Sequence, residues 1–194
     1  MGKKINCIIV HGCPSTKESL IDMRERTYYK HWIPWAREEL LKKGIKTETP
    51  LMPEPWAPVY EKFKEEFEKY EVNQETVLIG HSCGCAFLVQ WLGDTKRKIK
   101  KLILVAPWKL PKPNQVNPIK EKFYGYEIDK TIPERVSEGI VMFTSDNEQV
   151  GGQESIEMYR ASLGGRIITL SGRGHFTLEN MGTVEFPELL EQVV

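Results

Sequence analysis

The chain has 194 residues, with 27 basic (Lys and Arg) and 27 acidic (Asp and Glu) side chains. Such a balance provides no overall field that would attract nucleic acid or an anionic membrane surface, so we expect neither as a partner. The length suits a single domain, residues 1–194, that buries a core without the help of disulfides or metals.

Short apolar runs alternate along the chain with longer amphipathic stretches. In chain order, we expect strands at residues 5–10, 45–49, 76–79, 102–105, 140–143 and 167–170. The helical spacing of apolar residues predicts helices at residues 32–43, 56–70, 83–92, 153–163 and 184–193. Strands that alternate with helices indicate βαβ units, and uniformly apolar strands indicate a parallel sheet covered on both faces. The pattern therefore predicts an α/β fold.

The N-terminal region carries no evident targeting signal. Residues 1–4 run directly into the predicted strand at 5–10, which is too short for the apolar region of a secretory signal. No apolar run approaches the length that a membrane span requires. We expect a cytoplasmic protein, present as a monomer or a weak homodimer.

The four cysteines, Cys7, Cys13, Cys83 and Cys85, contain no C-x-x-C pair. This spacing argues against a structural zinc site, and we expect no metal and no cofactor. Reduced thiols are the simpler expectation in a cytoplasmic protein, although the sequence is also compatible with a disulfide.

Residues 80–84 read G-H-S-C-G and follow the predicted strand at 76–79 directly. A strand, a tight turn and a helix put the Ser82 hydroxyl on a sharp corner, where it can attack a carbonyl carbon. Such a turn requires residues without bulk two positions before and after the serine, and Gly80 and Gly84 meet this need. The alternative is a glycine-rich turn in which Ser82 only caps the following helix.

A serine is a poor nucleophile unless a base activates it and an acid orients the base. In enzymes with this strand–turn–helix serine, the acid and then the histidine follow the serine along the chain. Only one of the four histidines, His175, comes after Ser82. It lies just beyond the predicted strand at 167–170 and follows Gly172 and Gly174, which let a loop turn back over the sheet. We therefore expect His175 to be the base.

Two carboxylates compete for the role of the acid. Asp146 and Glu148 both follow the predicted strand at 140–143 closely. The acid holds the correct imidazole tautomer and stabilises the imidazolium, so either residue could serve. Either could instead cap the next helix or remain solvated.

The oxyanion that forms during acyl transfer also needs hydrogen-bond donors. The backbone N–H of Cys83, directly after the nucleophile, is one candidate. The second donor usually comes from the loop after the first strand of the core, which makes the N–H of Gly12 or Cys13 the candidate.

Several short segments carry a resemblance to known proteins, and they occur in order at residues 8–12, 31–35, 40–44, 51–55, 80–84, 102–106 and 174–176. H-W-I-P-W at 31–35 and M-P-E-P at 52–55 are far more selective than the serine motif itself. Over nearly its whole length, the chain resembles the small serine hydrolases related to retinoblastoma-binding protein 9 and the bacterial YdeN proteins.

The resemblance implies a minimal α/β-hydrolase fold, a three-layer sandwich with six parallel strands in the order 2-1-3-4-5-6 and little or no lid. Ser82 and His175 carry over directly. The family pattern resembles S-x-[DN]-D-[PQ], which favours Glu148 as the acid but requires the loop to shift for the longer side chain. Asp146 would then sit two positions early and stays the alternative. V-P often follows in the family, whereas residues 150–152 here read V-G-G.

Two segments are candidates for shaping the substrate pocket. The segment 14–30 is longer than the family suggests, and the segment 107–137 is an insertion of a length that is usually functional or mobile. Trp108, Phe123, Tyr124, Tyr126 and the proline-rich loop 50–58 are predicted to line an aromatic, uncharged pocket, with packing in the core as the alternative. His11 is a further pocket candidate, or it packs locally.

The sequence therefore predicts a serine hydrolase that cleaves small or medium esters through an acyl-enzyme on Ser82, with a small-molecule ester or acyl compound as its partner. One alternative is a binding or scaffold protein that keeps the fold with an impaired triad. A peptidase or acyltransferase with the same triad is another. A nucleotide-binding fold is disfavoured, because no P-loop or G-x-G-x-x-G follows a predicted strand.

Overall fold

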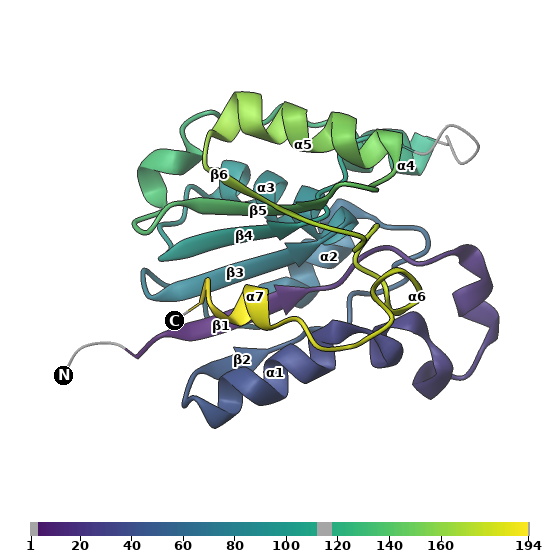
Figure 1. The fold of residues 1–194 in the computed structure, drawn as a ribbon. Helices are drawn as coiled ribbons and strands as arrows, with labels where there is room; N and C mark the ends of the chain where they lie inside the picture. Colours follow the sequence, from purple (N-terminus) through teal and green to yellow (C-terminus); the bar gives the residue numbers. More distant parts are fainter. Residues whose placement is uncertain (1–3, 112–117, 194) are drawn as a thin grey trace.

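A computed structural model describes residues 4–111 and 118–193 of the chain. Its centre is a six-stranded sheet with the order β2-β1-β3-β4-β5-β6, in which all neighbouring strands run parallel. The strands are β1 (Asn6–Val10), β2 (Lys46–Glu48), β3 (Thr76–His81), β4 (Lys101–Val105), β5 (Ile140–Ser145) and β6 (Arg166–Leu170). The predicted strand order and α/β class are thus confirmed (Figure 1).

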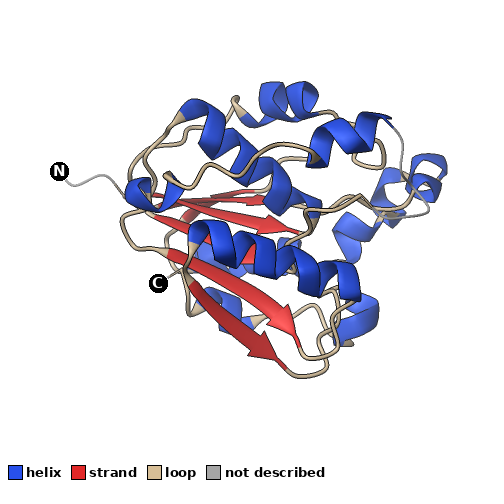
Figure 2. Ribbon diagram, turned by 90° about the horizontal axis from the view of Figure 1, so that it is seen from above, coloured by secondary structure: helices blue, strands red, loops and turns tan. Residues whose placement is uncertain are grey.

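Helices cover both faces of the sheet, as Figure 2 shows from above. The α-helices are α1 (Trp32–Lys42), α2 (Tyr60–Phe67), α3 (Cys83–Thr95), α4 (Pro118–Tyr124), α5 (Val150–Leu163), α6 (Leu178–Met181) and α7 (Pro187–Leu190). In the described residues, the connections contain the 3-10 helices η1 (Thr16–Leu20), η2 (Met23–Glu25), η3 (Thr27–Lys30) and η5 (Ile132–Arg135). The result is a three-layer α/β/α sandwich.

Two apolar cores form because alternate residues of each strand face opposite sides of the sheet. Ile8 of β1 and Leu78 of β3 pack with α2, α3 and α5, whereas Ile9 and Ile79 pack with α1 and α7. The central strand β3 is buried at every position, as expected for a strand with both faces covered. The edge strand β6 differs from that expectation, because all five of its residues are exposed or partly exposed.

Prolines shorten two of the predicted helices. The helix expected at 56–70 begins only at Tyr60, because Pro58 keeps the residue before it out of the helical conformation. The helix expected at 184–193 is reduced to α7, because Pro187 can occupy only the first turn of a helix.

The structure describes only part of the chain ends and of the long insertion that the sequence predicts. Residues 1–3, residues 112–117 within the predicted insertion 107–137, and Val194 lie outside the described residues. Within the described residues, no helix is both long and apolar enough to cross a bilayer.

Candidate active site

Ser82 lies between the end of β3 and the start of α3, with φ 53° and ψ −120°. This conformation is costly for a residue other than glycine and is typical of a strained nucleophile turn. Neighbouring chain segments pass very close on both sides. A Cβ on Gly80 would lie 2.8 Å from the Cα of Cys85, and a Cβ on Gly84 would lie 2.5 Å from the carbonyl oxygen of Val10. The two glycines of the motif are therefore required by packing.

His175 reaches Ser82 from the loop that follows β6. Its Nε2 lies 2.8 Å from Ser82 Oγ. The backbone of His175 is held at both ends: its N–H donates to Asn180 Oδ1 at 3.0 Å, and its carbonyl lies 2.9 Å from His81 Nε2. The ring also packs edge-on against Trp108, with 5.4 Å between centroids. The imidazole is thus fixed within hydrogen-bond reach of the serine.

Glu148, rather than Asp146, approaches the other side of the His175 ring. Glu148 Oε2 lies 3.0 Å from His175 Nδ1, and Glu148 Oε1 accepts the N–H of Gln149 at 2.7 Å. The residue is only 5% exposed, which leaves its carboxylate little water to interact with. The sequence alone left both carboxylates open, and the structure brings Ser82, His175 and Glu148 into one hydrogen-bonded series.

Asp146 instead ties two loops together. Its carboxylate accepts the hydroxyl of Ser171 at 2.6 Å and the N–H of Gly172 at 2.8 Å. These hydrogen bonds, that of Ser171 first, lower the pKa of Asp146 from its ordinary value. Asp146 thus holds the loop that carries His175 against the end of β5.

Two more histidines surround this series in a neutral state. Burial lowers the pKa of His31 to about 3 and the pKa of His81 well below its ordinary value, and repulsion from neighbouring imidazoles adds to both shifts. The His31 and His81 rings are 4.6 Å apart, and the His81 and His175 rings are 5.4 Å apart. Because His31 and His81 stay uncharged near pH 7, they do not repel an imidazolium that forms on His175.

The candidate oxyanion donors lie next to the serine. Within residues 4–111 and 118–193, the backbone N–H groups of Gly12, Cys13 and Cys83 donate to no protein acceptor. A Cβ on Gly12 would lie 3.1 Å from the Cβ of Ser82, so the loop after β1 passes directly beside the nucleophile. These N–H groups are therefore unoccupied and close to the reacting hydroxyl.

The cysteines differ from the sequence expectation. Cys13 and Cys83 form a disulfide, so the expectation of reduced thiols is wrong for this pair, while Cys7 and Cys85 are free and buried. The physical reason is that β1 pairs with β3, which brings the loop after β1 next to the start of α3. The two cysteines are 70 residues apart in the sequence, so their spacing alone gave no sign of the bond.

A cavity of about 1090 Å³ opens at Ser82 and His175. Trp108, Tyr124 and His11 line it, as predicted, and so do parts of the loop 50–58 and of the segment 14–30. Two predicted aromatic residues differ. Phe123 is buried in the core at 1% exposure, and Tyr126 packs against the same core, with its hydroxyl 3.0 Å from that of Tyr159.

The cavity is more polar than the predicted uncharged pocket. Among its charged lining residues are Glu18, Glu25, Arg26 and Lys30 of the segment 14–30. The guanidinium of Arg26 stacks over the ring of Trp56 at 5.1 Å. The segment 14–30 does line the pocket, as expected, but its charged side chains make the prediction of an uncharged pocket wrong at this rim.

The imidazole of His11 forms part of the cavity wall. Its Nε2 accepts the N–H of Met52 at 2.9 Å, so the ring proton is on Nδ1, which donates to the carbonyl of Gly12 at 2.7 Å. Burial lowers the pKa of His11, in keeping with this neutral tautomer. The ring thus joins the loop after β1 to the proline-rich loop.

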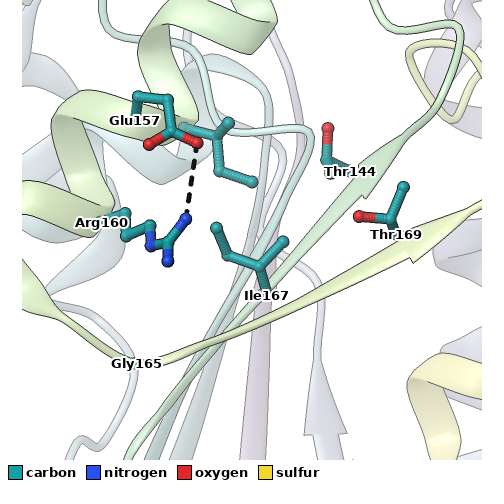
Figure 3. A pocket seen from close by; sticks show the side chains of 7 residues that line it. Thr144, Glu157, Arg160, Gly165, Ile167 and Thr169 are labelled. Atoms are coloured by element: carbon teal, nitrogen blue, oxygen red, sulfur yellow. Dashed lines mark ion pairs between the residues drawn. The ribbon is translucent and has the colours of Figure 1, made fainter.

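A second cavity, of about 420 Å³, lies between α5 and the strands β5 and β6 (Figure 3). Its walls include Thr144, Ile167 and Thr169, and an ion pair of 3.9 Å joins Glu157 to Arg160. None of the nucleophile, base or acid candidates lines it, so it is not the candidate active site.

Sequence reasoning missed the residues that support the series. Asn147 Oδ1 accepts the N–H of Gly174 at 2.8 Å, and Asn180 and His81 hold the backbone of His175. Gly152 makes room for the longer acid, because its missing Cβ would lie 2.7 Å from the Cδ of Glu148. One sign of this space at Gly152 was present in the sequence: residues 150–152 read V-G-G where the family often has V-P.

A curated relative is YdeN of Bacillus subtilis, which is 29% identical over 80 residues. The aligned region covers 39% of this chain and 42% of YdeN, which is less than half of the length of that relative. The expected resemblance to YdeN proteins is confirmed, whereas the resemblance to retinoblastoma-binding protein 9 stays a prediction.

Solved structures share the fold at low sequence identity. The YdeN crystal structure from Bacillus subtilis has a TM-score of 0.80 at 19% identity and covers 98% of each chain. Est1E of Butyrivibrio proteoclasticus, with ferulic acid bound, has a TM-score of 0.65 at 14% identity, covering 98% of this chain and 87% of that one. An esterase domain from Rhodothermus marinus has a TM-score of 0.63 at 14% identity, covering 97% and 85%.

These likenesses show an α/β-hydrolase fold. In this chain, the candidate site lies at the carboxyl ends of β1, β3, β5 and β6. The sequence model of the family described as serine hydrolase matches residues 24–193. The chain therefore belongs to the serine hydrolase family.

Proposed function

We propose that the protein hydrolyses small or medium carboxylic esters through an acyl-enzyme on Ser82. The observation that carries this proposal is the 2.8 Å contact between Ser82 Oγ and His175 Nε2, continued by the 3.0 Å contact between His175 Nδ1 and Glu148. A hydroxyl, a base and an orienting carboxylate in series are the parts that nucleophilic acyl transfer needs.

In the first half-reaction, Ser82 Oγ attacks the ester carbonyl carbon while His175 Nε2 takes the hydroxyl proton. Glu148 keeps the proton of the neutral imidazole on Nδ1 and stabilises the imidazolium that forms. The N–H of Cys83, with that of Gly12 or Cys13, donates to the developing oxyanion. His175 then gives its proton to the leaving alkoxide, and the acyl group stays on Ser82.

In the second half-reaction, water replaces the alcohol. His175 Nε2 takes a proton from the water as the oxygen attacks the acyl-enzyme carbonyl, and the same N–H groups bind the second oxyanion. The proton returns to Ser82 Oγ as the carboxylic acid departs. Each donor that fits the oxyanion but not the planar ester contributes about 3–4 kcal/mol to lowering the barrier.

The cavity supports an ester of modest size. A volume of about 1090 Å³ accommodates a small or medium molecule, and Trp108 and Tyr124 offer apolar ring surface to an acyl or aryl group. Est1E, a protein of the same fold, holds ferulic acid, an aromatic acid, which is the class of product that such a pocket suits.

The hydrogen-bonded series also favours an enzyme over a binding protein with an impaired triad. A fluorophosphonate probe tests the nucleophile, because it labels only an activated serine. We expect the wild-type protein to gain one probe mass on Ser82 and the Ser82→Ala variant to gain none. Equal labelling of the two proteins, or no labelling of the wild type, would falsify the proposal.

Turnover completes the test. The wild type should hydrolyse p-nitrophenyl acetate, and both Ser82→Ala and His175→Ala should reduce kcat by about 10³-fold or more. The variant Lys42→Ala serves as a control, since Lys42 pairs with Glu39 on the exposed face of α1 and should leave turnover unchanged.

A further inference from the structure

The disulfide between Cys13 and Cys83 joins the two chain segments that supply the candidate oxyanion donors. Cys83 is the residue directly after the nucleophile and the first residue of α3. Cys13 belongs to the loop after β1, and its Cα lies 5.6 Å from that of Cys83. The disulfide thus links the two segments, the loop after β1 and the start of α3, that each carry a donor of the proposed oxyanion hole.

Other contacts hold the start of α3 and the loop after β1 as far as Gly12, but η1, which follows the loop, is exposed. The start of α3 packs against the end of β1, where a Cβ on Gly84 would meet the carbonyl oxygen of Val10 at 2.5 Å. The loop, in contrast, leads into η1, which has no buried residue, and the nearby bonds between Glu18 and Thr27 lie within the segment 14–30 itself. The disulfide therefore adds a covalent tie at Cys13 to the hydrogen bonds of His11 and the close approach of Gly12 to Ser82.

We propose that the Cys13–Cys83 disulfide is a positioning element of the oxyanion hole, and that a dithiol reductant lowers kcat by breaking it. This inference rests on the proposed ester hydrolysis. Displacing a catalytic group by about 1 Å can cost about 10²-fold in rate, and removing one oxyanion donor costs about 10²- to 10³-fold. Because reduction loosens the donor without deleting it, we expect kcat to fall by roughly tenfold to a hundredfold.

The bond is accessible to a reductant through the substrate cavity. Cys13 is half-buried and lines the cavity together with Ser82, whereas Cys83 is only 1% exposed. A thiolate of the dithiol attacks Sγ of Cys13, and Cys83 leaves as a thiolate. The second thiol of the reductant then displaces Cys13. Two electrons and two protons pass to the pair, and the reductant becomes a disulfide.

The other two cysteines are unsuited to the exchange. Cys7 and Cys85 are fully buried, and burial raises the pKa of both thiols above the ordinary value, so neither forms a thiolate readily. A redox effect on activity therefore points to Cys13 and Cys83 among the described residues.

Alkylation followed by intact-mass measurement tests the bond itself, independently of any activity. Aerobically purified protein, unfolded without reductant, should show two reactive thiols, and protein treated with dithiothreitol should show four. Four thiols in the untreated protein would overturn the inference.

Kinetics test the positioning role. With p-nitrophenyl acetate, reduction should lower kcat with little change in KM, and reoxidation should restore it. The Ki of an aryl trifluoromethyl ketone, which forms an oxyanion on the serine, should rise by the same factor as kcat/KM falls. If the disulfide only stabilised the fold, its reduction would lower the melting temperature without changing kcat or Ki. That result would contradict the proposal.

Variants provide the matched controls. Cys13→Ser/Cys83→Ser should have the low kcat of the reduced wild type and should not respond to dithiothreitol. Cys7→Ala, which removes a cysteine remote from the site, should keep both the kcat and the response of the wild type. If oxidised wild type neither hydrolyses the ester nor reacts with a fluorophosphonate, the proposed function fails; if it does both but ignores reduction, only this inference fails.

Discussion

Glu148 occupies space that Gly152 leaves empty, since a Cβ on Gly152 would lie 2.7 Å from the carboxyl carbon of Glu148. Gly152 is itself buried in the third position of α5, so the helix cannot move away to make room for a larger residue. The longer acid and the glycine four residues later are therefore two parts of one arrangement: the extra methylene of the glutamate is accommodated where the helix carries no side chain.

Gly152→Ala should therefore displace the Glu148 carboxylate and weaken its hydrogen bond to His175. We expect kcat for p-nitrophenyl acetate to fall roughly tenfold or more, since a misplaced orienting group costs about 10²-fold per ångström. Glu154→Ala is the matched control, because Glu154 is exposed on the same helix. Steady-state kinetics of the two variants checks the prediction, and equal kcat values would show that Gly152 is not needed for the acid.

Glu148→Gln and Asp146→Asn should have very different effects on turnover. Glutamine does not stabilise the imidazolium, so we expect kcat to fall by about 10³- to 10⁴-fold. Asp146→Asn keeps an oxygen that accepts the N–H of Gly172, and kcat should change by less than about threefold. Measuring both variants at one pH, with circular dichroism as a control for folding, decides between the two carboxylates. A larger loss for Asp146→Asn would reverse the assignment.

Glu148→Asp should be impaired although the charge is kept. Aspartate is shorter by one carbon–carbon bond, roughly 1.5 Å, so its carboxylate would no longer meet His175 Nδ1 at hydrogen-bond distance. We expect kcat to fall about tenfold to a hundredfold, between the wild type and Glu148→Gln. If the aspartate variant matched the wild type, the loop after β5 would be mobile enough to follow the shorter side chain.

Asn180 should act through the backbone of His175, whose N–H it accepts at 3.0 Å. Asn180→Ala removes this acceptor, and we expect kcat to fall several-fold, with less effect on KM, because the imidazole loses part of its support. Asn180→Asp restores an oxygen at the same position and should recover most of the activity. The rescue distinguishes loss of the acceptor from loss of packing; an aspartate variant as impaired as the alanine variant would argue against this role.

Acid should destabilise the fold through the buried histidines. The pKa of His31 in the folded protein is about 3, and that of His81 also lies below the ordinary value. Below pH 6.5, these two histidines therefore bind more protons in the unfolded chain than in the folded chain. The free energy of unfolding is therefore highest above pH 6.5 and falls as the pH drops, by at most about 1.4 kcal/mol per pH unit for each histidine. For His31 this loss continues down to about pH 3.

Replacing one of these rings should flatten that dependence. The two ring nitrogens of His31 are buried and have no hydrogen-bond partner in the described residues. His31→Leu therefore removes a titrating group without breaking a hydrogen bond. Urea unfolding at several values between pH 6.5 and 4.5 should show a smaller loss of the free energy of unfolding for this variant than for the wild type. The same slope for both proteins would mean that His31 is not neutral in the folded state.

The sequence by itself determined the parts that depend on local pattern. The alternation of strands and helices, the strained serine at the end of β3 and the histidine after β6 can all be recognised from a few neighbouring residues. The resemblance to known hydrolases supplied the strand order, which the structure confirms. The carboxyl ends of parallel strands meet at one edge of the sheet, so the chain order of Ser82 and His175 already implied that they converge.

Only the tertiary structure decided which side chains meet within that edge. Three features join residues whose relative positions depend on how loops cross the ends of the strands. They are the contact of Glu148, rather than Asp146, with His175, the space at Gly152 and the disulfide between Cys13 and Cys83. Such loops carry little periodic signal, because their conformation is set by contacts with distant segments rather than by local propensity. For the same reason, the length of the segment 14–30 pointed to the rim of the pocket, but the sequence did not predict which of its charged residues line the cavity.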